Sequence, residues 1–261
     1  MAAVEITTED SILILTLNDP ASLNAMGAEM ANEFREAVRF ASEQAEQFRC
    51  LLITGTGRAF CSGGNVGMMG GGQPQAQAER VSLGTHHHYV MKLLKALPYP
   101  IVTAVNGPAA GLGFSYALCG DLVVAAQSAF FLAAFRNIGV SPDGGLSWML
   151  PKIVGWARAK ELLLMGNRLS AEQALEWGLI NRVFSDDSFR AESLALARQL
   201  AQGPTLALGT MRQLAWEGWD QGYERHLDCE EQRQLQTFAT ADAREGAMSM
   251  LEKRVPSFTG S

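Results

Sequence analysis

The sequence is short of charge and has no long apolar run. Asp, Glu, Lys and Arg make up 18% of the 261 residues. No apolar stretch approaches the ~20 residues that a membrane-spanning helix needs. The net charge of −6 argues against nucleic acid as a partner. The stretch MAAVEITTEDS has neither a basic nor an apolar segment, so we expect no signal peptide. These absences predict a globular protein of the cytoplasm that binds neither membranes nor nucleic acids.

Cysteine is scarce, and no cluster of metal ligands is visible. The four cysteines, at positions 50, 61, 119 and 229, show no CxxC spacing, which predicts reduced thiols in place of a disulfide framework. His86, His87 and His88 are consecutive. Neighbouring residues on a helix point ~100° apart, so these three imidazoles cannot chelate one ion together. We therefore predict no metal site.

Hydrophobic residues make up 48% of the chain, enough for one large α/β domain or a domain with an appendage. Strands are expected mostly in the first half, at 4–7, 12–17, 51–55, 101–105, 122–126 and 129–132. Helices are expected at 27–46, 81–97, 157–165 and 171–177. From 187 onward the pattern is helical throughout, with breaks at 203–204 and near 242. Residues 67–77 are rich in Gly and Gln and are predicted to be mobile, either as a lid or as a surface loop.

Two glycine-rich loops each follow a predicted buried strand. AFCSGGNV occupies 59–66, and AVNGPAAGLG occupies 104–113, where it leads into a helix. Glycine lets another group approach the backbone closely. Unpaired N–H groups at a helix start attract negative charge. The alternative for the second loop is a tight strand-to-helix corner packed against the core. Two such loops together can supply the pair of N–H donors that a thioester enolate oxygen needs.

These two loops resemble the signature loops of the enoyl-CoA hydratase/isomerase (crotonase) superfamily. The similarity runs over nearly the whole chain, down to EKRVPSFTG near its end. It implies an α/β fold, with a crotonase-like spiral of ββα turns over residues 1–200 that contains the CoA and acyl site. It also implies a C-terminal helical trimerisation region over 201–261, and hence a homotrimer or a dimer of trimers.

The resemblance further implies an acyl-CoA thioester substrate and no cofactor beyond its CoA moiety. By the match, the N–H groups of Gly64 and Leu112 hold the thioester oxygen. The family's CoA-binding positions are matched by Ser22, Leu23, Asn24, Ala25, Ala59, Ser62, Gly63, Gly64, Asn65, Val66 and Lys253. Lys253 corresponds to a lysine near the CoA phosphates that reaches a neighbouring subunit. Relatives often carry a basic residue just before the Asn, where this chain has Leu23.

The two glutamates that enoyl-CoA hydratases use to activate water are missing. Their positions are occupied by Ser115 and Ala134. A hydroxyl and a methyl group cannot deprotonate water, so hydration is disfavoured. Asp143, in SPDGG, matches the single acid of the superfamily's double-bond isomerases, and the chain is most similar to the ring-1,2-epoxyphenylacetyl-CoA isomerases. By position alone, capping the helix that follows is the commoner role for an Asp before Gly-Gly-Leu, and the resemblance favours the catalytic role instead.

Two alternatives stay open. In the 4-chlorobenzoyl-CoA dehalogenases of the same superfamily, a histidine at the position of His88 works with an aspartate at the position of Asp143. The tryptophan that orients that aspartate is replaced here by Phe135, which cannot donate a hydrogen bond. The other alternative is a protein that binds CoA thioesters without turning them over.

Overall fold

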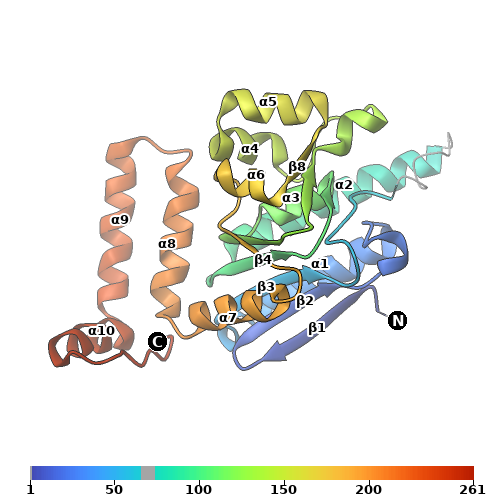
Figure 1. The fold of residues 1–261 in the computed structure, drawn as a ribbon. Coiled ribbons are helices and arrows are strands. Elements are labelled where there is room, and N and C mark those ends of the chain that lie inside the picture. Colours follow the sequence, from blue (N-terminus) through green and yellow to red (C-terminus); the bar gives the residue numbers. More distant parts are fainter. Residues whose placement is uncertain (1, 66–73) are drawn as a thin grey trace.

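The chain is built around a six-stranded sheet with the order β1-β2-β3-β4-β6-β9 (Figure 1). The computed structural model describes residues 2–65 and 74–261, without the side chains of 74–84. Val66 and residues 67–73 of the predicted mobile segment therefore lie outside the described residues. β1 and β2 form an antiparallel hairpin, and the later strands pair in parallel. The strands are β1 (Val4–Glu9), β2 (Ile12–Leu17), β3 (Cys50–Gly55), β4 (Ile101–Val105), β6 (Leu122–Ala126) and β9 (Arg182–Phe184).

Helices cover both faces of this sheet. α1 (Ala28–Glu43) and α2 (Pro74–Ala96) lie on one face, and α7 (Phe189–Ala201) lies on the other (Figure 1). All five residues of β4 are buried, because a parallel strand between two helical layers is shielded on both sides. α1 buries its apolar stripe of Met30, Phe34, Val38 and three alanines against the sheet.

A second, smaller sheet has three strands in the order β5-β7-β8. Its strands are β5 (Ala109–Ala110), β7 (Phe130–Leu132) and β8 (Arg168–Ser170). Four helices occur in the same part of the sequence, between β5 and β9: α3 (Leu112–Ala117), α4 (Leu146–Val154), α5 (Trp156–Met165) and α6 (Ala171–Glu176). Short 3-10 helices occupy Pro20–Ser22, Ala45–Gln47 and Ala134–Ile138. α6 begins with a capping box: the Ser170 hydroxyl oxygen accepts from the Gln173 N–H, and the Gln173 Oε1 accepts from the Ser170 N–H, both at 3.2 Å.

The last three helices form an arm beside the sheet (Figure 1). They are α8 (Thr205–Gly218), α9 (Tyr223–Phe238) and α10 (Ala241–Glu252). α9 buries none of its residues, and large apolar side chains along the arm are exposed, Tyr223, Leu235, Phe238, Met250 and Leu251 among them. An arm of this composition has apolar surface that its own chain leaves uncovered.

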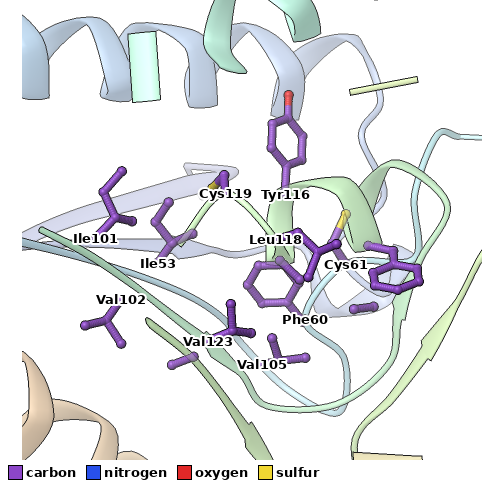
Figure 2. Close-up of a cluster of buried hydrophobic side chains, with 14 of the residues drawn as sticks. Ile53, Phe60, Cys61, Ile101, Val102, Val105, Tyr116, Leu118, Cys119 and Val123 are labelled. Carbon is purple, nitrogen blue, oxygen red and sulfur yellow. The ribbon is translucent and has the colours of Figure 1, made fainter. Parts of the chain in front are cut away.

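Most predicted elements are confirmed, and two boundaries are wrong. α2 begins at Pro74, seven residues before its predicted start at 81. The break between α8 and α9 was not predicted, although Gly218 and Gly222 flank it. Figure 2 shows part of the buried core, with side chains from β3 (Ile53), β4 (Ile101, Val102 and Val105), β6 (Val123) and α3 (Tyr116). No helix among the described residues is long and apolar enough to cross a membrane.

Candidate active site

The two glycine-rich loops lie directly against each other. The Ala110 N–H donates to the Cys61 carbonyl at 2.9 Å, and Cys61 forms a bridge with Ala109. A Cβ on Gly113 would lie 2.2 Å from the Cys61 carbonyl oxygen, so only glycine permits this approach. Loops that are fifty residues apart in sequence thus form one backbone surface.

The predicted N–H donors lie at this junction. Gly63 has a φ of +96°, and a Cβ there would lie 2.7 Å from the Ala110 carbonyl oxygen and 3.4 Å from the Leu112 nitrogen. Leu112 is the first residue of α3, so its N–H has no acceptor within the helix. Among the described residues, neither the Leu112 N–H nor the Gly64 N–H has a hydrogen-bond acceptor. α3 is only six residues long, so the donors matter more here than the helix dipole.

The loop over residues 19–25 is hydrogen-bonded to the first glycine loop. The Ser62 N–H donates to the Leu23 carbonyl at 3.0 Å, and the Ser62 hydroxyl donates to the Ser22 carbonyl at 3.2 Å. The Met26 N–H donates to the Gly63 carbonyl at 2.7 Å. Residues assigned to CoA binding from two distant segments are therefore adjacent.

Asn24 has a structural part in this arrangement. Its side chain is fully buried and donates to the carbonyls of Thr56 at 3.0 Å and Ala59 at 2.8 Å, while its Oδ1 accepts from the Asp19 N–H. With φ at 57°, the backbone of Asn24 is in the left-handed region, which Asn tolerates better than most residues. The side chain that was expected to face CoA is thus engaged within the protein.

Asn106 is a residue that the sequence analysis missed. Its Nδ2 donates to the carbonyls of Gly57 and Ala59, both at 3.0 Å, and its Oδ1 accepts from the Gly55 N–H at 3.1 Å. Asn24 and Asn106 thus share the Ala59 carbonyl and hold the start of the first glycine loop from both sides. An Asn directly before Gly-Pro, next to a buried strand, was the available signal.

A groove of about 550 Å³ opens beside these loops. It is lined by Asp19, Pro20, Ala25, Gly27, Met30 and Asn65 among others. Ala25 and Asn65 come from the two segments assigned to CoA. Its lining combines polar and apolar residues, which suits the pantetheine and nucleotide parts of CoA.

Asp143 lies close to the second glycine loop but does not cap a helix. α4 begins at Leu146 with Gly145 as its N-cap residue and has no side-chain cap, so the capping interpretation is wrong. The Oδ1 atom of Asp143 is buried and has no hydrogen-bond partner among the described residues. Burial raises the pKa of this carboxyl group above its ordinary value, and a positive charge on nearby His88 partly offsets the effect. A partly buried carboxylate with a raised pKa is suited to moving protons.

The three histidines differ in their surroundings. His87 is 5% exposed, and its Nδ1 lies 2.9 Å from the Tyr116 hydroxyl. Burial lowers the pKa of His87 to about 4, so its ring is neutral at pH 7. His86 Nε2 lies 3.1 Å from a guanidinium nitrogen of Arg35. His88 is exposed and lines the same cavity as Gly144 and Gly145. Figure 2 shows Tyr116 leaving α3 with its hydroxyl pointing out of the core cluster.

That cavity, of about 420 Å³, extends from the Asp143 loop to the end of α8. Met91, Trp148, Met149 and Trp216 line it, and the rings of Trp148 and Trp216 are stacked with centroids 5.9 Å apart. Lys92, Lys95 and Asp220 line it as well. An apolar cavity with few polar groups is typical of a site for an acyl chain or ring.

The remaining predicted residues fall outside this arrangement. Burial raises the pKa of the Cys61 and Cys119 thiols to about 12, so neither is a reactive nucleophile. Lys253 directly follows α10 on the arm, away from the glycine loops of its own chain (Figure 1). Phe135 is buried and carries no polar atom toward Asp143.

Several known proteins are similar to this chain in both sequence and fold. The model of the enoyl-CoA hydratase/isomerase family matches residues 7–261. The 1,2-epoxyphenylacetyl-CoA isomerase of Escherichia coli K12 is 41% identical over 254 residues, which cover 97% of this chain and 96% of the relative. 4-Chlorobenzoyl coenzyme A dehalogenase-2 of an Arthrobacter species is 32% identical over 230 residues, covering 88% and 83%. The crystal structure of an enoyl-CoA hydratase from Polaromonas sp. JS666 superposes with a TM-score of 0.92 at 34% identity, covering 98% of this chain and 99% of that one.

The match over almost the full length, the fold and the paired glycine loops agree: the chain belongs to the enoyl-CoA hydratase/isomerase, or crotonase, family.

Proposed function

We propose that the protein isomerises acyl-CoA thioesters by moving a double bond, or by rearranging a ring epoxide, with Asp143 as the acid that carries the proton. The observation that supports this most strongly is the Asp143 carboxylate. Within the described part of the chain, one of its oxygens is buried without a hydrogen-bond partner, next to a loop junction with two N–H groups that have no acceptor there. Ser115 and Ala134 stand where a hydratase has carboxylates, so Asp143 is left as the proton carrier of the site.

In this scheme CoA lies along the groove lined by Ala25 and Asn65. The thioester oxygen accepts hydrogen bonds from the N–H groups of Gly64 and Leu112. The acyl group enters the cavity between the Asp143 loop and Trp216. Gly144, which directly follows Asp143, lines this cavity, and this supports a position of the carboxylate near the carbons next to the thioester.

The proton transfer then has two steps. Asp143 takes a proton from carbon 2 of a 3-enoyl thioester, and the electron pair moves onto the thioester oxygen, where two N–H donors stabilise the negative charge. The protonated Asp143 then delivers the proton to carbon 4, and the double bond ends between carbons 2 and 3. Neutralising a buried carboxylate in the first step is favourable because burial disfavours its charged form.

A second candidate is nucleophilic dehalogenation. It is favoured by the position of His88, which lies in the same cavity as the Asp143 loop, and by the likeness to a 4-chlorobenzoyl coenzyme A dehalogenase. In that reaction the Asp143 carboxylate attacks the ring carbon that bears chlorine and chloride leaves. Water then hydrolyses the aryl ester. Phe135 cannot orient the carboxylate by a hydrogen bond, which favours the isomerase instead.

The test is a comparison of four thioesters with the purified wild-type protein. These are 3-hexenoyl-CoA, a ring-1,2-epoxyphenylacetyl-CoA, 4-chlorobenzoyl-CoA and crotonyl-CoA. We expect isomerisation of at least one of the first two, and neither chloride release nor hydration. Chloride release as the main reaction would establish the dehalogenase, and CoA binding without turnover of any substrate would mean that the fold serves binding alone.

We also propose that the arm of α8–α10 assembles a homotrimer, because its exposed apolar side chains need cover. In the trimer, Lys253 of one subunit binds the CoA phosphates held by a neighbour. Light scattering with size-exclusion chromatography should give three times the mass of the chain, or six times for a dimer of trimers. Lys253→Ala should weaken CoA binding about fivefold, as loss of one surface charge contact would.

A further inference from the structure

Ser115 makes a contact that the proposed reaction does not explain. The residue is completely buried on α3, and its hydroxyl donates to the backbone carbonyl of Asp143 at 2.9 Å. The same carbonyl accepts from the Leu146 N–H at 3.2 Å. The backbone of Asp143 is therefore held from both sides, while its Oδ1 has no partner among the described residues.

The loop that carries Asp143 also packs closely against α3. Gly144 has a φ of +58°, and a Cβ there would lie 2.7 Å from the Ser115 Cβ and 2.9 Å from the Leu112 Cδ1. Both neighbours belong to α3, whose first residue, Leu112, presents the N–H group proposed to hold the thioester oxygen. The short helix thus sets the position of the carboxylate relative to that N–H.

We propose that Ser115 is a positioning residue for Asp143: its hydroxyl holds the backbone of the residue that carries the carboxylate, while the carboxylate itself stays available. This inference rests on the proposed function.

The first test is Ser115→Ala, which removes the hydroxyl and keeps the volume small. We expect kcat for 3-hexenoyl-CoA to fall about tenfold, because the carboxylate is less firmly placed, while KM changes less than about twofold. The matched control is Ser193→Ala. Ser193 is 2% exposed on α7, and its hydroxyl has no partner among the described residues, so this variant should keep wild-type kinetics.

A double-mutant cycle separates positioning from general damage. If Ser115 acts through Asp143, adding Ser115→Ala to Asp143→Asn should not lower the residual rate further. If it lowers that rate by the same factor of about ten, Ser115 acts independently of Asp143 and the inference is wrong. If Ser115→Ala leaves kcat unchanged while Asp143→Asn abolishes turnover, only the inference fails. If Asp143→Asn leaves turnover unchanged, the proposed function itself fails.

Discussion

The junction of the two glycine loops is most sharply tested by Gly63→Ala. The added methyl group would lie 2.7 Å from the Ala110 carbonyl oxygen, closer than a Cβ normally comes to any atom, and 3.4 Å from the Leu112 nitrogen. The neighbour is backbone, so it cannot rotate away. We therefore expect the two loops to separate by several tenths of an ångström, which moves the Leu112 N–H relative to that of Gly64.

The magnitude follows from two separate costs. An alanine at φ +96° costs about 1–2 kcal/mol, and the contact adds about 1–3 kcal/mol. The melting temperature should therefore fall by roughly 5–15 °C. Losing one oxyanion donor lowers kcat by about 10²–10³-fold, and a misplaced donor should cost about 10²-fold. The CoA groove lies to one side of this contact, so KM should change less than about threefold.

The assay is exchange of the carbon-2 protons of hexanoyl-CoA in D₂O, followed by NMR, since exchange requires the enolate but no double bond. Gly178→Ala is the matched control. Gly178 also has a left-handed φ, +72°, but a Cβ there meets nothing within 4 Å. Exchange at the wild-type rate in Gly63→Ala would refute the assignment of the oxyanion site. Equal losses in both variants would mean that backbone strain, and not the junction, causes the effect.

Three further predictions concern the surroundings of the site. His87→Gln should flatten the pH dependence of stability. The pKa of His87 is lowered from 6.5 to about 4, so wild type loses up to roughly 3 kcal/mol as pH falls from 6.5 to 4, and the variant, compared by urea unfolding, should not. Equal losses would contradict the assigned burial. Trp216→Ala should open the far end of the acyl cavity, so kcat/KM for decenoyl-CoA should rise about tenfold relative to that for hexenoyl-CoA. An equal loss of kcat/KM for both chain lengths would place Trp216 outside the acyl site. Arg212→Met should lower the free energy of unfolding by about 3–5 kcal/mol, because the Asp121 carboxylate, 2.7 Å from Arg212 Nε in the wild type, loses its positively charged partner. An unchanged melting temperature would contradict this.

Local sequence patterns were sufficient for most of the fold. β2, β3 and β4 are mostly apolar and rich in β-branched residues, and α1 has a clear apolar stripe, so each could be predicted from its own residues. The start of α2 could not, because its first turns have the polar, Gln-rich composition of a loop. The break between α8 and α9 carries a signal, two glycines around Trp219 and Asp220, that the helical pattern on both sides obscured.

The site shows a different limit. Whether Asp143 caps a helix or stays available depends on where α4 begins. The left-handed φ values of Gly144 and Gly145, +58° and +83°, delay that start and move the carboxylate off the cap position. No local pattern specifies this. The hydrogen bond between Ser115 and Asp143 spans 28 residues. The hydrogen bonds of the Asn24 side chain likewise go to a distant segment, at Thr56 and Ala59. Contacts of this kind exist only once the chain has folded.

The central claim is that Asp143 carries the proton, and Asp143→Asn tests it most directly. Asparagine keeps the shape of the side chain but cannot take up a proton, and no helix cap is lost, since Asp143 caps nothing. We predict that kcat for the isomerisation of 3-hexenoyl-CoA falls by about 10²–10⁴-fold while the melting temperature and the affinity for CoA stay close to wild type. In wild type, kcat/KM should rise with pH through a midpoint above 3.8, the ordinary pKa of Asp. An Asp143→Asn variant that isomerises this substrate at the wild-type rate would contradict the account.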